Sequence, residues 1–177
     1  EISPFTLADS VTEISTKRRN AIRRAAEDNG IEIVGLHWLL VKPEGLYINH
    51  PDEYIRIQTQ EYIEALIHFC ADIGGKVLVH GSPHQRTIKE GWNAKDSWDY
   101  AIETFKVSLK AARQRNVIYC LEPLSPEQTN FINTIKEAIR FVKEVRHPNL
   151  KMVFDCRSAS ASEKSLTEAL LQALDSG

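Results

Sequence analysis

Two carboxylates end short apolar segments of this sequence. Glu122 ends the run NVIYCLE, and Asp155 ends the run LKMVFD. A carboxylate at the end of a buried strand is costly to desolvate unless a partner compensates its charge. A divalent cation is one such partner, because carboxylate oxygens suit Mg²⁺ and Mn²⁺. The two carboxylates could equally cap loop amides or pair with Arg86 or Arg157, and the spacing alone leaves both interpretations open.

Further polar and aromatic side chains occur at the ends of four apolar runs or in the loops that follow them. As candidates for contacting a substrate we take His37, Trp38, His80, Trp92, Gln128 and Arg157. A single histidine in an apolar strand more often packs in the core than acts in chemistry. Trp92 lies in a polar loop and is therefore a better pocket candidate than Trp98, which falls in the apolar stripe of a helix.

The elements that must position these residues alternate along the chain. Short runs rich in Val and Ile predict strands buried on both faces, at 31–40, 76–81, 116–122 and 150–155. Apolar residues at helical spacing predict helices at about 13–29, 52–73, 96–115, 134–146 and 165–174. Thr134 with Glu137, and Ser165 with Glu168, have the spacing of capping boxes.

This alternation predicts an α/β fold with a parallel sheet. The longest loops, 41–52 and 81–95, follow strands, and in such folds functional groups collect at the carboxyl ends of the strands. A dinucleotide-binding sheet needs a glycine-rich turn after the first strand, but the sequence there is KPEGLYINHP. Four strands are too few for a complete (β/α)8 barrel, so a smaller fold or part of a barrel is expected.

Composition limits the classes of partner. The 177 residues carry a net charge of −2, which provides no general attraction to nucleic acid or anionic membranes. No apolar run is long enough to span a membrane, and the start EISPFTLADS does not read as a secretion signal. Cys70, Cys120 and Cys156 form no metal or redox motif. We therefore expect buried free thiols and a reducing, cytoplasmic location.

Four segments together resemble a known family. GLHWLL, VHGSPHQR, CLEPLSPEQTNFINT and MVFDCRS are similar to the sugar-phosphate isomerases and epimerases among the xylose-isomerase-like TIM barrels, a group that also contains ketose 3-epimerases and abasic-site endonucleases. The resemblance extends over about 16–175. It implies a partial (β/α)8 barrel with about strands 2 to 5 of 8, forming one domain over 1–177 that is incomplete at both ends.

The resemblance also implies a metal site. Glu122 and Asp155 match the first Glu and the Asp of a family set of metal ligands, whose remaining His and Glu would come from later strands. The metal would be Mn, Mg, Co or Zn, and Glu122 would also act as a catalytic acid or base. The epimerases of the family carry a second glutamate where this chain has Gln128, and a histidine where it has Ser158. These two departures bear on the identity of the substrate more than on the fold.

The function implied is a metal-dependent isomerase or epimerase that moves a proton through an enediolate of a sugar or sugar phosphate. One alternative is a nuclease of the abasic-site type, which a net charge of −2 and Ser158 both disfavour. Another is a non-catalytic half-barrel that associates with itself into a homo-oligomer through its exposed sheet edges.

Overall fold

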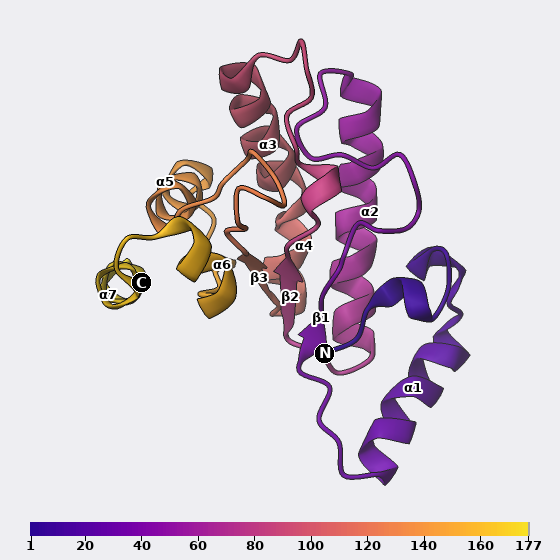
Figure 1. Ribbon diagram of the computed structural model, residues 1–177. Coiled ribbons are helices and arrows are strands. Elements are labelled where there is room, and N and C mark those ends of the chain that lie inside the picture. Colours follow the sequence, from indigo (N-terminus) through magenta and orange to yellow (C-terminus); the bar gives the residue numbers. More distant parts are fainter. Residues whose placement is uncertain (177) are drawn as a thin grey trace.

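A four-stranded parallel sheet runs through the molecule in the order β1-β2-β3-β4. The computed structural model describes residues 1–176. The strands are β1 (Gly35–Leu36), β2 (Val77–His80), β3 (Ile118–Leu121) and β4 (Leu150–Met152). Helices follow each strand and pack beside one another along the sheet (Figure 1). The predicted parallel α/β architecture is therefore confirmed, and the sequential strand order is that of consecutive βα units.

Each of the five predicted segments is helical, but the described residues contain seven α-helices. They are α1 (Thr16–Asp28), α2 (Glu53–Asp72), α3 (Ala94–Ser108), α4 (Lys110–Arg115), α5 (Ile135–Val145), α6 (Cys156–Ser162) and α7 (Leu166–Asp175). The predicted helix 96–115 is interrupted at Leu109, next to Ser108, whose hydroxyl donates to the carbonyl of Thr104 one turn earlier, a contact that bends helices. The short helix α6 was not predicted. Within residues 1–176, no helix combines the length and apolarity of a membrane span.

The first strand is much shorter than its apolar run. Its middle is confirmed at Gly35–Leu36, where the backbones of β1 and β2 are so close that a Cβ on Gly35 would lie 1.8 Å from the Val77 carbonyl oxygen. Before it, Ile31 is 63% exposed and pairs with no strand. After it, Trp38 has a φ of 53°, which ends the extended conformation. On the outer side, Ile2 forms a parallel bridge with Leu36 and so occupies the position of a preceding strand.

Side chains alternate between two environments along the central strands. Leu78, His80, Tyr119 and Leu121 are fully buried, whereas the residues between them are half-buried. The buried set faces the helices, because Phe105 of α3 packs edge-on against both His80 and Tyr119. The opposite face of the sheet is the one that leads to the cavity described below.

The three cysteines are free thiols, as predicted. Cys70 is buried and Cys120 is half-buried, but Cys156 is exposed. The expectation of a buried thiol is wrong for Cys156, because the chain leaves the sheet at Met152 and Cys156 begins the surface helix α6.

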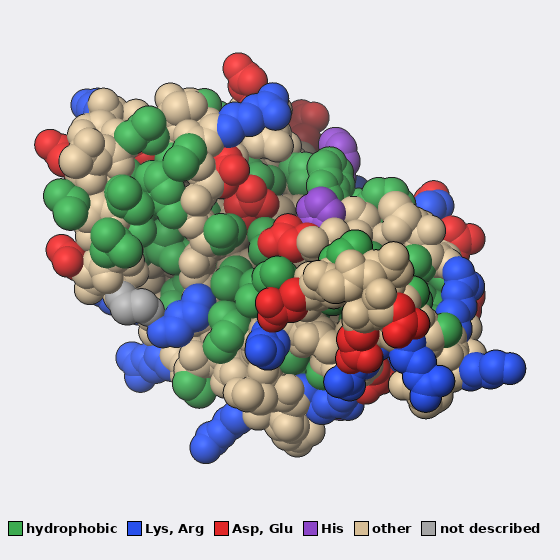
Figure 2. Space-filling view, turned by 90° about the horizontal axis from the view of Figure 1, so that it is seen from below, with side chains coloured by type: hydrophobic (Ala, Val, Ile, Leu, Met, Phe, Trp, Pro, Cys, Tyr) green, Lys and Arg blue, Asp and Glu red, His purple; other side chains and the backbone are tan. Residues whose placement is uncertain are grey.

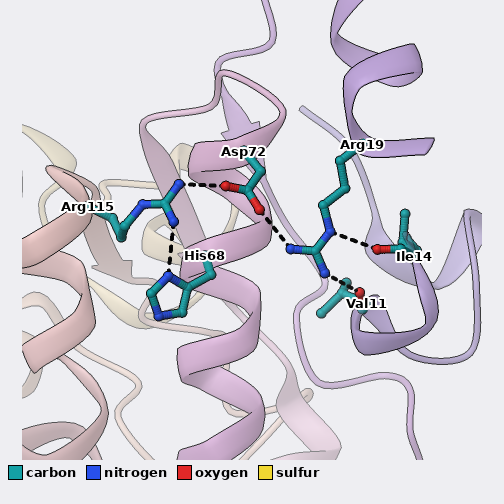
Figure 3. A network of polar contacts seen from close by, with 6 residues as sticks. All are labelled: Val11, Ile14, Arg19, His68, Asp72 and Arg115. Atoms are coloured by element: carbon teal, nitrogen blue, oxygen red, sulfur yellow. Dashed lines mark hydrogen bonds and ion pairs between the residues drawn. The ribbon is translucent and has the colours of Figure 1, made fainter. Parts of the chain in front are cut away.

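A network of ion pairs joins α1, α2 and α4 (Figure 3). Asp72 at the end of α2 accepts hydrogen bonds from Arg19 at 2.8 Å and from Arg115 at 2.6 Å. Arg19 also donates to the carbonyls of Val11 and Ile14, which ties the N-terminal segment to α1. Burial raises the pKa of Asp72, but the hydrogen bonds and charges of Arg115 and Arg19 outweigh it and lower the pKa overall.

Replacing Asp72 with asparagine is expected to lower the free energy of unfolding by about 1–2 kcal/mol at pH 7, because two charge-assisted hydrogen bonds are lost. A lowered pKa means that the contribution of the carboxylate is present above its unfolded pKa of about 3.9 and is lost as the pH falls below that value. Urea unfolding of both proteins at pH 7 and near pH 3 measures the difference. Glu27→Gln, in an exposed pair with Arg23, should change stability by less than about 0.5 kcal/mol. If the difference in free energy of unfolding between Asp72→Asn and the unchanged protein were the same at both pH values, the role given to the Asp72 carboxylate would be contradicted.

Candidate functional site

A cavity of about 250 Å³ lies at the carboxyl ends of the strands. Its walls come from the segments that follow all four strands, from Val79 within β2 and from the first residue of the sequence. They consist of Glu1, His37, Trp38, Val79, Gly81, Ser82, Pro83, Glu122, Leu124, Gln128, Asp155, Arg157 and Ser158. The two carboxylates singled out in the sequence therefore share one cavity.

The backbone of Glu122 is fixed on both sides. Its N–H donates to the carbonyl of His80 at 3.1 Å, and its C=O accepts from the guanidinium of Arg86 at 2.8 Å. Since His80 pairs with Leu121, the next residues, Gly81 and Glu122, lie beside one another on the cavity face. A Cβ on Gly81 would lie 2.6 Å from a carboxylate oxygen of Glu122. Only glycine at this position leaves room for the carboxylate as it is placed.

The electrostatic environment of Glu122 disfavours its charge. Burial raises the pKa of Glu122, the negative charge of Asp155 raises it further, and the positive charge of Arg86 opposes both. Among residues 1–176, the carboxylate accepts no hydrogen bond and forms no ion pair. A half-buried carboxylate that shares a cavity with a second one is an arrangement that a bound cation would stabilise.

Asp155 caps the start of a helix. It is the N-cap of α6, and its Oδ1 accepts a hydrogen bond from the backbone N–H of Ser158 at 2.6 Å. The alternative in which these carboxylates cap loop amides therefore holds for one oxygen of Asp155. The alternative of pairing with an arginine does not hold, because Arg86 binds the carbonyl of Glu122, and neither carboxylate forms an ion pair with Arg157 in the described part of the chain.

The donor set fits part of a metal site. Glu122 and Asp155 offer the hard oxygen ligands that divalent cations prefer. Burial and then the charge of Asp155 raise the pKa of Glu122, and a cation would oppose both effects. Within residues 1–176, no three side chains of the His, Cys, Asp and Glu types converge as a metal-binding group. Two carboxylates are fewer ligands than a divalent cation takes, so a cation bound here would need further ligands from outside the described residues.

Four of the six predicted substrate-contacting residues line the cavity: His37, Trp38, Gln128 and Arg157. The imidazole Nε2 of His37 is 2.8 Å from the hydroxyl of Ser3. The indole of Trp38 is 51% exposed, and its positive φ turns it out of the strand. The amide oxygen of Gln128 accepts hydrogen bonds from the backbone and the hydroxyl of Ser125.

The structure does not bring His80 and Trp92 to the cavity. His80 is fully buried, and its Nδ1 is 2.7 Å from the hydroxyl of Tyr119. Burial lowers the pKa of His80 to about 3, so the imidazole is neutral. Its side chain points away from the cavity because residues along a strand alternate, and His80 shares the helix-facing side with Leu121 rather than the side of Glu122. Trp92 packs in a surface cluster of aromatic rings with Tyr47 and His50.

Several residues of the cavity were not predicted from the sequence. Gly81 and Leu124 lie within three residues of strand ends, so the same rule that selected Glu122 could have found them. Ser158, which follows the fourth strand and stands where the related epimerases have a histidine, lines the cavity, and its backbone N–H donates to Asp155.

The curated proteins that are similar to this chain have names that agree with one another. Two curated proteins are similar: the D-psicose 3-epimerase of Ruminiclostridium cellulolyticum, 27% identical over 85% of this chain and 51% of its own length, and a probable ketose 3-epimerase of Synechocystis sp., 26% identical over 74% and 46%. The chain thus spans about half the length of these relatives.

Solved structures share the fold. A D-psicose 3-epimerase from Clostridium cellulolyticum H10, crystallised with D-tagatose, superposes with a TM-score of 0.82 at 23% identity, over 97% of this chain and 58% of that one. The 3-keto-D-glucoside 4-epimerase of E. coli gives a TM-score of 0.78 at 19% identity, over 90% of this chain and 62% of that one. The family model of the xylose isomerase-like TIM barrel matches residues 2–173. Its match covers nearly all of the sequence, and the chain therefore belongs to the xylose isomerase-like TIM barrel family.

Proposed function

We propose that this chain forms part of a divalent-metal-dependent epimerase or isomerase of ketose sugars. One observation carries the proposal: Glu122 and Asp155 meet in one cavity at the strand ends, and neither has an ion-pair partner among the described residues. The curated relatives, both named as 3-epimerases of ketoses, support the same class of reaction.

Glu122 and Asp155 would hold the cation together with ligands from outside this chain. When bound, the cation would supply positive charge that polarises the carbonyl of the sugar. The carboxylate of Glu122 would take the proton from the carbon next to the carbonyl, and the electron pair of the broken C–H bond would pass to the carbonyl oxygen as an enediolate. Return of a proton to the opposite face of that carbon would invert its configuration. No residue of this chain is assigned as the group that returns this proton.

The remaining residues of the cavity would orient the sugar. The exposed indole of Trp38 offers an apolar surface for the C–H face of a sugar, and His37 offers a ring nitrogen to a hydroxyl. Gln128 can exchange hydrogen bonds with a hydroxyl but cannot act as a base. The guanidinium of Arg157 is exposed at the rim, where it could bind the phosphate of a sugar phosphate or a terminal hydroxyl.

Proton exchange tests this proposal directly. The complete protein of which this chain is proposed to form part is incubated in D₂O with a panel of ketoses and ketose phosphates, with Mn²⁺, Mg²⁺, Co²⁺ or Zn²⁺ and with EDTA. Deuterium is followed by NMR at the carbons next to the carbonyl. We expect metal-dependent incorporation at one of these carbons, together with the epimer or isomer that it implies. Incorporation that EDTA leaves unchanged would contradict the role of the metal, and its absence from every sugar with every metal would contradict the proposed reaction.

Two parts of the surface bear on the alternative functions, a nuclease and a half-barrel that associates with itself. The cavity carries the acidic residues Glu1, Glu122 and Asp155 beside one arginine, which does not favour a nucleic acid backbone as its ligand.

Hydrophobic side chains gather on the side of the molecule where α5 and α7 lie (Figure 2). They include Leu166, Leu170, Leu171 and Leu174 of α7, each at least 42% exposed. Together with the position of β4 at the end of the sheet, this area favours contact with further protein, either more of a barrel or a second copy.

A further inference from the structure

A buried arginine lies immediately behind the carboxylate of the candidate site. Arg86 follows the short helical turn Pro83–Gln85 in the loop after β2, and it is fully buried. It forms no ion pair with any described carboxylate. Burial lowers its pKa to about 9, an effect that the charge of Glu122 opposes, so the guanidinium is still positively charged at neutral pH.

The contacts of Arg86 join three strand ends. Its Nη2 donates to the main-chain carbonyl of Glu122 at 2.8 Å. Its own carbonyl accepts from the side-chain amide of Asn49, which is fully buried in the loop after β1. The neighbouring carbonyl of Gln85 accepts from the N–H of Ile48 at 3.0 Å. Arg86 thus connects the loops after β1 and β2 to the residue that begins the loop after β3.

Burying Arg86 in this way is unfavourable for the free energy of folding. A buried guanidinium without a carboxylate partner loses its hydration, and the Nε and Nη1 groups of Arg86 have no partner among the described residues. A buried apolar side chain of similar length would avoid that cost. Such a side chain could neither donate to the Glu122 carbonyl nor place a positive charge near the half-buried carboxylate of Glu122.

We propose that Arg86 is a positioning residue, which holds the main chain at Glu122 so that its carboxylate stays directed into the cavity. The claim that this affects cation binding rests on the proposed function. The claim that Arg86 fixes the backbone at the end of β3 does not, because it concerns only contacts within this chain.

Two substitutions of Arg86 and one matched control separate these claims. Arg86→Met removes the charge and the donors, whereas Arg86→Lys keeps the charge on a flexible ammonium group that can still donate. Arg56 provides the control: it is also a buried arginine and donates to the main-chain carbonyls of His50 and Pro51, but it makes no contact with Glu122. Arg56→Met therefore reproduces the loss of a buried arginine away from the site.

Two readouts are taken on protein shown to be folded by near-ultraviolet circular dichroism. The first is hydrogen exchange of the backbone amides of Glu122 and Leu124, which donate to His80 and Ile132. We expect exchange at least about tenfold faster in Arg86→Met, a smaller change in Arg86→Lys, and no change at these amides in Arg56→Met. The second is the affinity for Mn²⁺, followed by the electron paramagnetic resonance of the free ion. We expect a loss of about 10- to 100-fold in Arg86→Met, partly restored in Arg86→Lys, and less than about twofold in Arg56→Met.

The two readouts distinguish a failure of the positioning role of Arg86 from a failure of the proposed function. Unchanged exchange at Glu122 and Leu124 in a folded Arg86 variant would overturn the proposal, whatever the metal affinity. Faster exchange in a protein that binds no Mn²⁺ even with Arg86 present would leave the positioning role standing and would count against the proposed function. Should Arg86→Met not fold, the same comparison of Arg86→Lys with Arg56→Lys decides the question.

Discussion

Replacing Glu122 with glutamine is expected to lower turnover by roughly 10³-fold while the protein stays folded. Glutamine has nearly the same shape, but its amide cannot take a proton from carbon and is a poor ligand for a hard cation. The measurement is the rate of deuterium incorporation, compared with the variant Glu127→Gln. Glu127 is an exposed glutamate in the loop just beyond, outside the cavity, and its replacement should leave turnover within about twofold.

The same substitution should not cost stability in the absence of metal. Burial, and then Asp155, raise the pKa of Glu122, so its charged form destabilises the fold as the pH rises through the unfolded pKa of about 4.3 and beyond. At pH 7 we expect metal-free Glu122→Gln to be at least as stable to urea as the unchanged protein. A variant that keeps full turnover, or one that loses both turnover and stability, would contradict the role given to Glu122.

Replacing Phe105 with alanine is expected to lower the free energy of unfolding by about 3–5 kcal/mol, the largest effect on stability that we predict. Phe105 is fully buried in α3, and its ring packs edge-on against Tyr119 at 5.4 Å, Phe141 at 5.5 Å and His80 at 5.6 Å between ring centres. Truncation removes buried apolar surface and leaves a cavity where sheet and helices meet.

Urea unfolding of Phe105→Ala, Phe105→Leu and Phe5→Ala measures this effect. The leucine variant keeps most of the volume and should lose about 1–1.5 kcal/mol. Phe5 is 39% exposed, so its replacement should cost less than about 1 kcal/mol. Similar losses for Phe105→Ala and Phe5→Ala would show that the aromatic cluster does not stabilise the core as described.

The alternation of elements and the two carboxylates were predictable because they depend on local pattern. Apolar runs that end in Glu122 and Asp155 are visible along the chain, and parallel topology brings such ends to one edge. The capping box of Thr134 and Glu137 forms as its spacing predicts, because both partners lie within one helical turn. For α7, the hydroxyl of Ser165 accepts from the N–H of Glu168.

What the sequence did not reveal depends on contacts between distant segments. The direction of His80 follows from its pairing with Leu121, and the interruption at Leu109 from a hydroxyl bonded one turn back. Tertiary contacts also bury Arg86, a residue type that composition alone would place on the surface. Two substrate-contacting predictions missed the cavity for different reasons: His80 takes the helix-facing side of the sheet, and Trp92 lies in a loop that packs it against Tyr47 and His50.

The contact between Gly81 and Glu122 has a consequence for how this protein can change over evolutionary time. A methyl group at position 81 would meet the movable end of a glutamate rather than rigid backbone, so the fold could absorb it by displacing the carboxylate. A single nucleotide change could then abolish the proposed chemistry while the fold stays intact and open to another function.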